Sequence, residues 1–154
     1  MADGALASAA AAKQISLDDL DIAVIIPCMN EEIAIGGMVR KLRELLPHSR
    51  IFVYDNNSTD DTVGEAERAG AIVRREKRQG KGFVVRRMFA DIDADIYMMV
   101  DGDNTYDIDA APKLIQTLVD DGLDMVNGAR KAVVEEAYRP GHAMGNKVLT
   151  EIMR

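Results

Sequence analysis

Asp95-Ile96-Tyr97-Met98-Met99-Val100 runs directly into Asp101-Gly102-Asp103, and this stretch indicates the fold most clearly. The apolar run is typical of a strand that is buried on both faces of a parallel sheet. Open α/β sheets bind their ligands outside the carboxyl ends of the strands. Two carboxylates at that position suit Mg²⁺ or Mn²⁺, ions that take further ligands from water and substrate phosphates. The stretch therefore predicts a metal-held diphosphate at a strand end, and a simple turn or helix cap is the alternative.

Strand and helix patterns alternate on both sides of this stretch. Short β-branched or apolar runs predict strands, and apolar residues at helical spacing predict helices between them. Strands that alternate with helices imply a mostly parallel sheet with right-handed crossovers. We therefore expect a doubly wound α/β fold with helices on both faces. The expected strands are 22–26, 51–54, 71–73, 95–100 and 123–126, and the expected helices are 35–46, 60–69, 82–91 and 109–121.

Length and composition narrow the class of protein. The chain has 154 residues, enough for one domain with a substantial core. A net charge of −7 argues against nucleic-acid binding, which favours a basic face. Cys28 is the single cysteine and fits a reducing compartment, and no apolar run approaches the length of a membrane span. We expect residues 1–20 to be a disordered leader, residues 21–154 to be the α/β domain, and the protein to be cytoplasmic.

Polar clusters follow the first three strands. Residues 27–32 and 55–62 are rich in Asn, Asp, Glu, Ser and Thr, for which helix capping is the simpler explanation and ligand contact the further one. Residues 74–78 are a charge run, most often a solvated surface. Gly80-Lys81-Gly82 opens a helix and favours an anion. Neither a P-loop nor a Gly-x-Gly-x-x-Gly motif after the first strand is present.

These motifs together resemble inverting family 2 glycosyltransferases with a GT-A fold. The matching segments, in order, are 24–32, 55–62, 80–82, 101–103 and 127–130. The branch that looks most similar contains dolichol-phosphate mannose synthase and bacterial polyprenyl-phosphate sugar transferases. The resemblance covers about residues 22–150. It implies transfer of a sugar, with inversion, from a nucleoside-diphosphate sugar to an acceptor in cell-envelope or glycoconjugate synthesis.

The resemblance also implies roles for individual residues. Asp101 and Asp103 match the Asp-x-Asp that holds Mg²⁺ or Mn²⁺ on the donor diphosphate, and Asp55 matches a nucleobase contact. Met29 replaces an aromatic residue that is common in the family. A metal and an arginine would neutralise the charge that builds on the departing nucleoside diphosphate. The predicted substrate-binding residues are Pro27, Met29, Glu31, Asp55, Lys81, Asp101, Gly102, Asp103 and Arg130.

The acceptor side of the family lies beyond the matched region. We therefore assign no general base, and we expect the chain to lack the carboxyl-terminal acceptor part. An amphipathic helix near residues 144–152 and a loop at residues 139–142 are expected at the end of the sequence. The donor is expected to be of the UDP or GDP type. The branch suggests a polyprenyl-phosphate acceptor and peripheral contact with the cytoplasmic face of a membrane.

Other functions remain open at this point. A non-catalytic nucleotide-sugar-binding fragment or pseudo-enzyme would keep the same site without transfer. A nucleotidyltransferase would also use paired carboxylates and Mg²⁺, but it normally has a Gly-rich basic loop after the first strand, where this chain has Asn30-Glu31-Glu32. A response-regulator-like domain needs an acidic pair in a different setting. The basic residues between Arg74 and Arg87 form a patch that suits anionic headgroups, with a solvated helix face as the alternative.

Overall fold

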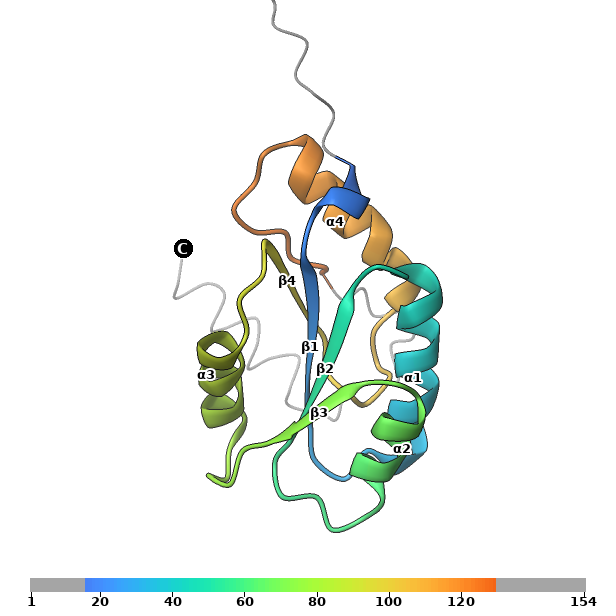
Figure 1. The fold of residues 1–154 in the computed structure, drawn as a ribbon, viewed down its shortest axis with the longest axis vertical. Helices are drawn as coiled ribbons and strands as arrows, with labels where there is room; N and C mark the ends of the chain where they lie inside the picture. The colour runs from blue at the N-terminus through green and yellow to red at the C-terminus, as the bar shows by residue number, and fades with distance from the viewer. Residues whose placement is uncertain (1–15, 130–154) are drawn as a thin grey trace, which may run out of the picture.

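The computed structural model describes residues 16–129, which form an α/β sheet structure (Figure 1). Four parallel strands lie in the order β3-β2-β1-β4. The strands are β1 (Ile22–Cys28), β2 (Arg50–Asp55), β3 (Ile72–Arg75) and β4 (Ile96–Met99). The helices are η1 (Leu17–Asp19), α1 (Glu32–Leu45), α2 (Thr62–Arg68), α3 (Lys81–Asp91), η2 (Ile108–Ala110) and α4 (Ala111–Asp120).

The winding of the chain confirms the predicted doubly wound class. From β1 the chain moves outward to β2 and β3, and it then crosses back to place β4 on the other side of β1. Right-handed crossovers in the two directions put helices on opposite faces of the sheet. Accordingly α1 and α2 lie on one face and α3 lies on the other (Figure 1). The chain order thus reverses between β1 and β4.

Each of the two central strands sends alternate side chains into two separate cores. Val24 and Ile26 of β1 belong to the core beneath α1, whereas Ala23 and Ile25 belong to the core beneath α3. This alternation is the strand period of two, applied to a sheet covered on both sides. Tyr54 of β2 is fully buried in the α3 core.

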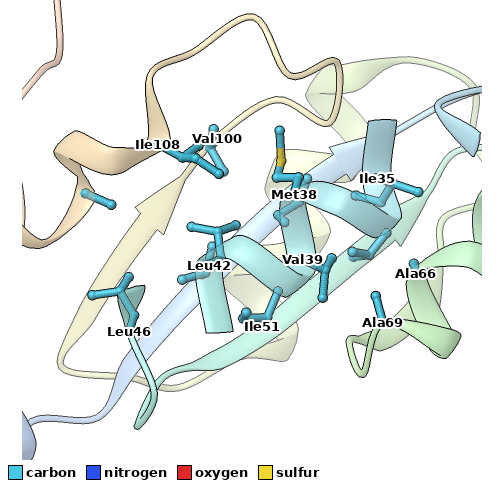
Figure 2. Packing of buried hydrophobic residues seen from close by; sticks show 14 of the residues in the cluster. Ile35, Met38, Val39, Leu42, Leu46, Ile51, Ala66, Ala69, Val100 and Ile108 are labelled. Carbon is cyan, nitrogen blue, oxygen red and sulfur yellow. The ribbon is translucent and has the colours of Figure 1, made fainter. Parts of the chain in front are cut away.

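The larger core is formed by the apolar stripe of α1. Ile35, Met38, Val39 and Leu42 recur at helical spacing and are buried against the sheet (Figure 2). The helix ends at Leu45, just before Pro47, as the sequence predicted. No helix within residues 16–129 is long and apolar enough to cross a membrane.

The first strand continues past the point where the sequence predicted its end. We expected Pro27 to stop the strand, yet β1 runs to Cys28 with Pro27 opposite Tyr54. Proline lacks the N–H that a sheet ladder requires. The pairing of β1 with β4 ends at Ile25 opposite Met99, so Pro27 lies beyond the ladder on that side.

Two expectations near the β4 side of the sheet are wrong. The predicted strand at 123–126 is not formed, because a strand needs hydrogen-bonded neighbours and no other described segment pairs with these residues. β4 is also not buried on both faces: Met99 is 52% exposed, and it lies on the same side as Tyr97 but outside the core beneath α3.

The amino-terminal boundary also differs from the expected one. Residues 17–19 belong to the predicted disordered leader but form η1, where the side chain of Ser16 accepts a hydrogen bond from the N–H of Asp18. Leu17 and Leu20 pack against the α1 core, and this apolar contact orders the segment. The rest of the predicted leader, residues 1–15, lies outside the described residues.

The α1 stripe yields a stability prediction. Replacing the fully buried Leu42 with alanine should lower the free energy of unfolding by about 2–5 kcal/mol, the usual cost of truncating a buried leucine. Urea denaturation followed by circular dichroism measures the change. Ile33→Ala is the matched control on the same helix, because Ile33 is 96% exposed and should change the unfolding free energy little. Equal losses in both variants would contradict the assigned core.

Candidate functional site

The loops after the strands enclose a cavity of about 340 Å³ at the carboxyl edge of the sheet. It lies at the reversal of chain order between β1 and β4, the place where doubly wound sheets bind ligands. Most of the predicted site residues line it. The lining residues are Pro27, Cys28, Met29, Glu31, Asn56, Gln79, Gly80, Lys81, Val84, Asp101, Gly102 and Asp103. Arg130, also predicted, lies outside the described residues.

Close packing between the β1 and β4 loops fixes the floor of the cavity. A Cβ atom at Gly102 would lie 2.5 Å from Sγ of Cys28, much closer than real Cβ atoms approach a sulfur. Gly102 is therefore required by space, which explains the glycine between the two aspartates. The contact holds Asp101 and Asp103 directly beside the loop that carries Glu31.

Carboxylates make this part of the cavity strongly negative. Burial raises the pKa of the Cys28 thiol to about 12, and the charges of Glu31, Asp55, Asp101 and Asp103 add to that shift. The pKa of Glu31 is also raised, first by desolvation and then by Asp103, Asp60 and Asp101. Burial is the first cause of both pKa shifts and the neighbouring carboxylates are the second, so a cation would be stabilised beside these carboxylates.

Asp101 already has a positive partner. The ammonium group of Lys81 forms an ion pair with Oδ1 of Asp101, and the hydroxyl of Tyr106 donates to Oδ2 at 3.4 Å. Lys81 is the first residue of α3, so its charge and the free N–H groups of that helix end lie on the same wall of the cavity. The wall formed by α3 therefore suits an anion.

Asp103 shapes its own loop as well as lining the cavity. Its Oδ1 accepts hydrogen bonds from the backbone N–H of Thr105 at 3.0 Å and from the Thr105 hydroxyl at 2.7 Å. This is the turn that we considered as the alternative explanation of the Asp-x-Asp pattern. The turn accounts for an acceptor at position 103, but an asparagine would accept equally well, so the turn does not require the charge.

The second strand offers Asn56 to the cavity, where the sequence predicted Asp55. Asp55 is 3% exposed; its Oδ1 accepts from the N–H of Ser58 at 3.0 Å, and its Oδ2 lies 3.8 Å from Nε of Arg75. Side chains two residues apart in a strand point to the same face, so Asp55 lies on the same side of β2 as the core residue Val53. This pattern indicates a buried Asp55, and we did not use it in the prediction.

Asn56 connects the β2 and β3 loops through its side-chain amide. Its Nδ2 donates to the carbonyls of Glu76 and Arg78 at 2.9 and 2.8 Å, and its Oδ1 accepts from the N–H of Gly80 at 2.7 Å. Gly80 has φ +126°, a conformation that favours glycine. Asn56 thereby sets the position of the α3 amino terminus, a role that no local sequence signal reveals.

Most other polar residues of the first two clusters bind each other. Oδ1 of Asn30, a residue with φ +60°, accepts from the N–H of Thr59 at 2.8 Å, and the N–H of Asn30 donates to Ser58 at 2.9 Å. The N–H of Glu31 donates to the hydroxyl of Thr62 at 2.7 Å. Helix capping, the simpler explanation for residues 27–32 and 55–62, therefore has unexpected partners. The start of α1 is satisfied by the loop between β2 and α2, and no side chain at the N-cap position caps either α1 or α2.

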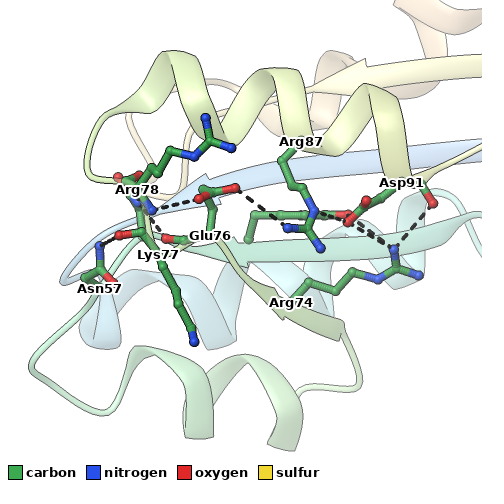
Figure 3. Close-up of polar contacts among 9 residues, drawn as sticks. Asn57, Arg74, Glu76, Lys77, Arg78, Arg87 and Asp91 are labelled. Carbon is green, nitrogen blue, oxygen red and sulfur yellow. Dashed lines mark hydrogen bonds and ion pairs between the residues drawn. The ribbon is translucent and has the colours of Figure 1, made fainter.

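Met29 and Gln79 form the outer part of the cavity. Met29 is 47% exposed, and the amide nitrogen of Gln79 lies 2.9 Å from its sulfur. Oε1 of Gln79 accepts from Nδ2 of Asn57 at 3.1 Å, and Figure 3 shows Asn57 also bonded to Lys77. Gln79 was not among the predicted site residues, since it directly follows a charge run and has no distinguishing pattern of its own.

The chemistry of the donor set fits a divalent ion shared with a ligand. No group of three or more His, Cys, Asp or Glu side chains within residues 16–129 is arranged to hold a metal alone. Asp101 and Asp103 supply hard oxygen donors to the cavity, and Lys81 supplies a positive charge beside Asp101. Mg²⁺ is commonly bound by one or two carboxylates together with substrate phosphates. The site therefore suits an ion that bridges protein and phosphate.

The chain belongs to the glycosyl transferase family 2, whose sequence profile matches residues 23–153. This membership and the parallel sheet confirm the predicted family and its GT-A-type fold. The nucleotidyltransferase and response-regulator alternatives are thereby removed.

Curated relatives include proteins of similar and of greater length. Protein RfbJ of Shigella flexneri is 52% identical over 123 residues, which cover 79% of this chain and 95% of that protein. The dolichyl-phosphate hexose transferase of Haloferax volcanii is 32% identical over 110 residues, covering 71% of this chain and 48% of that protein. This chain thus spans about half the length of the latter relative.

The solved structure of glucosyl-3-phosphoglycerate synthase from Mycobacterium tuberculosis has the same fold. It superposes with a TM-score of 0.59 at 29% sequence identity, covering 65% of this chain and 41% of the synthase. Structures of that synthase contain Mn²⁺ with uridine-diphosphate-glucose and phosphoglyceric acid, and Mg²⁺ with uridine-diphosphate.

The packing of Gly102 against Cys28 leads to a double-mutant test. Gly102→Ala should lower the free energy of unfolding by about 1–3 kcal/mol through overpacking, and combining it with Cys28→Ala should recover part of that loss. Gly37→Ala is the control: no atom lies within 4 Å of the added Cβ, so this helical variant should be neutral or slightly stabilised. Strictly additive losses for positions 28 and 102 would contradict the contact.

The loop network predicts a pH-dependent contribution from Asp60. Hydrogen bonds from Thr62 and from the N–H of Glu32 hold the pKa of Asp60 below its ordinary value of 3.8. The unfolded chain therefore binds more protons in acid, and this stabilisation is lost as the pH falls through the folded-state pKa. Asp60→Asn should be less stable at neutral pH, and urea midpoints should converge with those of the wild type below pH 3.8. A difference that stays constant with pH would contradict this role.

Proposed function

We propose that this chain carries the donor-binding half of a family 2 glycosyltransferase that uses a UDP-sugar and a polyprenyl-phosphate acceptor. The observation that carries the proposal is the meeting of opposite charges in one cavity, at the reversal of chain order between β1 and β4. Asp101 and Asp103 supply the carboxylates, and Lys81 at the amino terminus of α3 supplies an ammonium group in contact with Asp101. A nucleoside diphosphate bound between them would share a cation with the carboxylates and present its remaining charge to the lysine.

The acidic and basic residues of the cavity would bind different parts of the ligand. Asp101 and Asp103 would hold Mg²⁺ or Mn²⁺, which supplies Lewis-acid stabilisation of the leaving diphosphate. Lys81 would exchange part of its contact with Asp101 for a phosphate oxygen, and the N–H groups at the start of α3 would bind the same anion. Glu31 and Gly102 would shape the floor beneath them.

The nucleoside would occupy the outer part of the cavity. Pro27, Met29 and Gln79 line that region, and the exposed thioether of Met29 offers an apolar surface for a base. The proposed contact between Asp55 and the base remains a prediction, because both carboxylate oxygens already have protein partners. Asn56 would act in its place by fixing the loop that carries Gln79.

Relatives support the choice of donor and acceptor. The synthase that shares this fold binds uridine-diphosphate-glucose with Mn²⁺, which favours UDP over GDP. The haloarchaeal relative is a dolichyl-phosphate hexose transferase, which favours a polyprenyl phosphate as acceptor in glycoconjugate or cell-envelope synthesis. A phosphate acceptor is already an oxyanion, so it requires little deprotonation, and we assign no general base within residues 16–129.

Removing one charge without disturbing the turn tests the metal site. Asp103→Asn keeps an acceptor for Thr105, so the fold should persist. Calorimetric affinity for UDP in the presence of Mn²⁺ should fall roughly 10- to 100-fold, or about 1.4–2.8 kcal/mol, because the variant loses one of the two carboxylate charges that would hold the cation on the diphosphate. Asp107→Asn is the control, since Asp107 accepts from the N–H of Asp109 in a similar exposed turn outside the cavity. Equal affinity in both variants would contradict the assignment.

A nucleotide-sugar-binding protein without transferase activity is the alternative. Release of UDP from UDP-glucose in the presence of Mn²⁺ and a polyprenyl phosphate separates the two functions. Acceptor-dependent release supports the transferase. Metal-dependent binding without release would support the non-catalytic alternative.

A further inference from the structure

We propose that the outward face of α3 docks on an anionic lipid bilayer and places the cavity mouth at the headgroups. The surface, here called the α3 face, consists of Phe83, Arg86 and Phe89 of α3 together with Arg78 of the loop that precedes the helix. This inference deepens the proposed function by naming the surface that approaches a lipid acceptor. Vesicle binding can be measured without nucleotide, so one proposal can be contradicted while the other stands.

The apolar part of the α3 face consists of two phenylalanine rings. Phe83 is 43% exposed and Phe89 is 50% exposed, although Val84 and Met88 of the same helix already anchor it to the sheet. The rings are therefore not needed for the main core contact. The ring of Phe89 packs on Tyr97 with centroids 5.1 Å apart, which fixes its position beside β4. Partly exposed aromatic rings beside cations are typical of helices that lie in a membrane interface.

The charged part of the α3 face is positive in an otherwise acidic chain. Residues 74–87 contain seven Lys and Arg residues and a single acidic residue, Glu76, whereas the whole chain carries −7. Some of these cations are used internally: Figure 3 shows Arg74 and Arg87 directed at Asp91, and Arg87 also lies 3.9 Å from Glu76.

Arg78 and Arg86 remain available for an anionic surface. Neither has an acidic partner among residues 16–129. The guanidinium of Arg78 lies over the ring of Phe83, 5.4 Å from its centroid, and Arg86 is one helical turn from both Phe83 and Phe89. Cations interleaved with exposed rings match a bilayer interface, in which anionic headgroups lie above an apolar layer. A wholly polar partner would leave the rings without an apolar contact.

The α3 face adjoins the anion-binding part of the cavity. Lys81 begins the helix and lines the cavity, and Phe83 follows it by two residues. A bilayer in contact with Phe83 would therefore hold lipid phosphates beside the anion-binding wall of the site. A lipid acceptor could then reach Lys81 directly from the membrane surface, without crossing water.

Vesicle co-sedimentation of the whole chain tests the docking. We expect binding to phosphatidylcholine vesicles that contain phosphatidylglycerol, and little binding to pure phosphatidylcholine or at high salt. Phe83→Ser should weaken binding roughly tenfold, as expected for removing a large apolar group from the interface. Arg86→Gln should weaken it about fivefold, the change that corresponds to ~1 kcal/mol for a basic residue near such a surface.

Ile33→Ser is the matched control, because Ile33 is a highly exposed apolar residue on α1, across the sheet from α3. It should bind vesicles like the wild type. An equal loss in this control, binding that ignores lipid charge, or no binding by the wild type would overturn the proposal. A concentration-dependent dimer that Phe83→Ser abolishes would also overturn the proposal, because a second copy of the chain would then cover the α3 face. If the wild type binds UDP and Mn²⁺ but does not bind vesicles, this inference alone is overturned.

Discussion

The parallel pairing of β1 with β4 is the constraint on which the site depends. Because Ile25 lies opposite Met99, the two strands end at the same edge and their loops continue side by side. Gly102 can then pack against the sulfur of Cys28, and only a residue without a side chain fits there. This contact brings a pair of aspartates to the loop of Glu31. Without the return of the chain across the sheet, these residues would lie on separate surfaces.

The same pairing concentrates negative charge where the proposed ligand is itself an anion. Asp101, Asp103 and Glu31 line one cavity, and their charges add to the effect of burial in raising the pKa values of Cys28 and Glu31. The structure offsets part of it with Lys81, placed at a helix end that also favours anions. A divalent cation would offset the remaining repulsion between the carboxylates and the diphosphate, because it is attracted by both. The opposing charges thus explain why a metal and a basic helix start belong to one site.

The sequence predicted the parts of this arrangement that depend on local patterns. The β-branched run of β1 and the helically spaced stripe of α1 are such patterns, and both elements were found close to their predicted positions. The network of Asn30, Ser58 and Thr62 escaped prediction because its hydrogen bonds join residues 28 to 31 positions apart, which composition cannot reveal. The strand predicted at 123–126 failed for a related reason. Its apolar pattern is local, but a strand also needs a neighbour, and none is found in the part of the chain that the structure describes.

Electron paramagnetic resonance of Mn²⁺ tests the central claim most directly. The claim is that the protein and a nucleoside diphosphate share one cation where the chain order reverses between β1 and β4. The chain should bind Mn²⁺ weakly by itself, because two carboxylates are an incomplete ligand set. Adding UDP should increase the bound fraction of Mn²⁺ beyond the sum of binding to protein alone and to UDP alone, and linkage requires Mn²⁺ to tighten UDP binding by the same factor. Independent binding of Mn²⁺ and UDP would contradict the account.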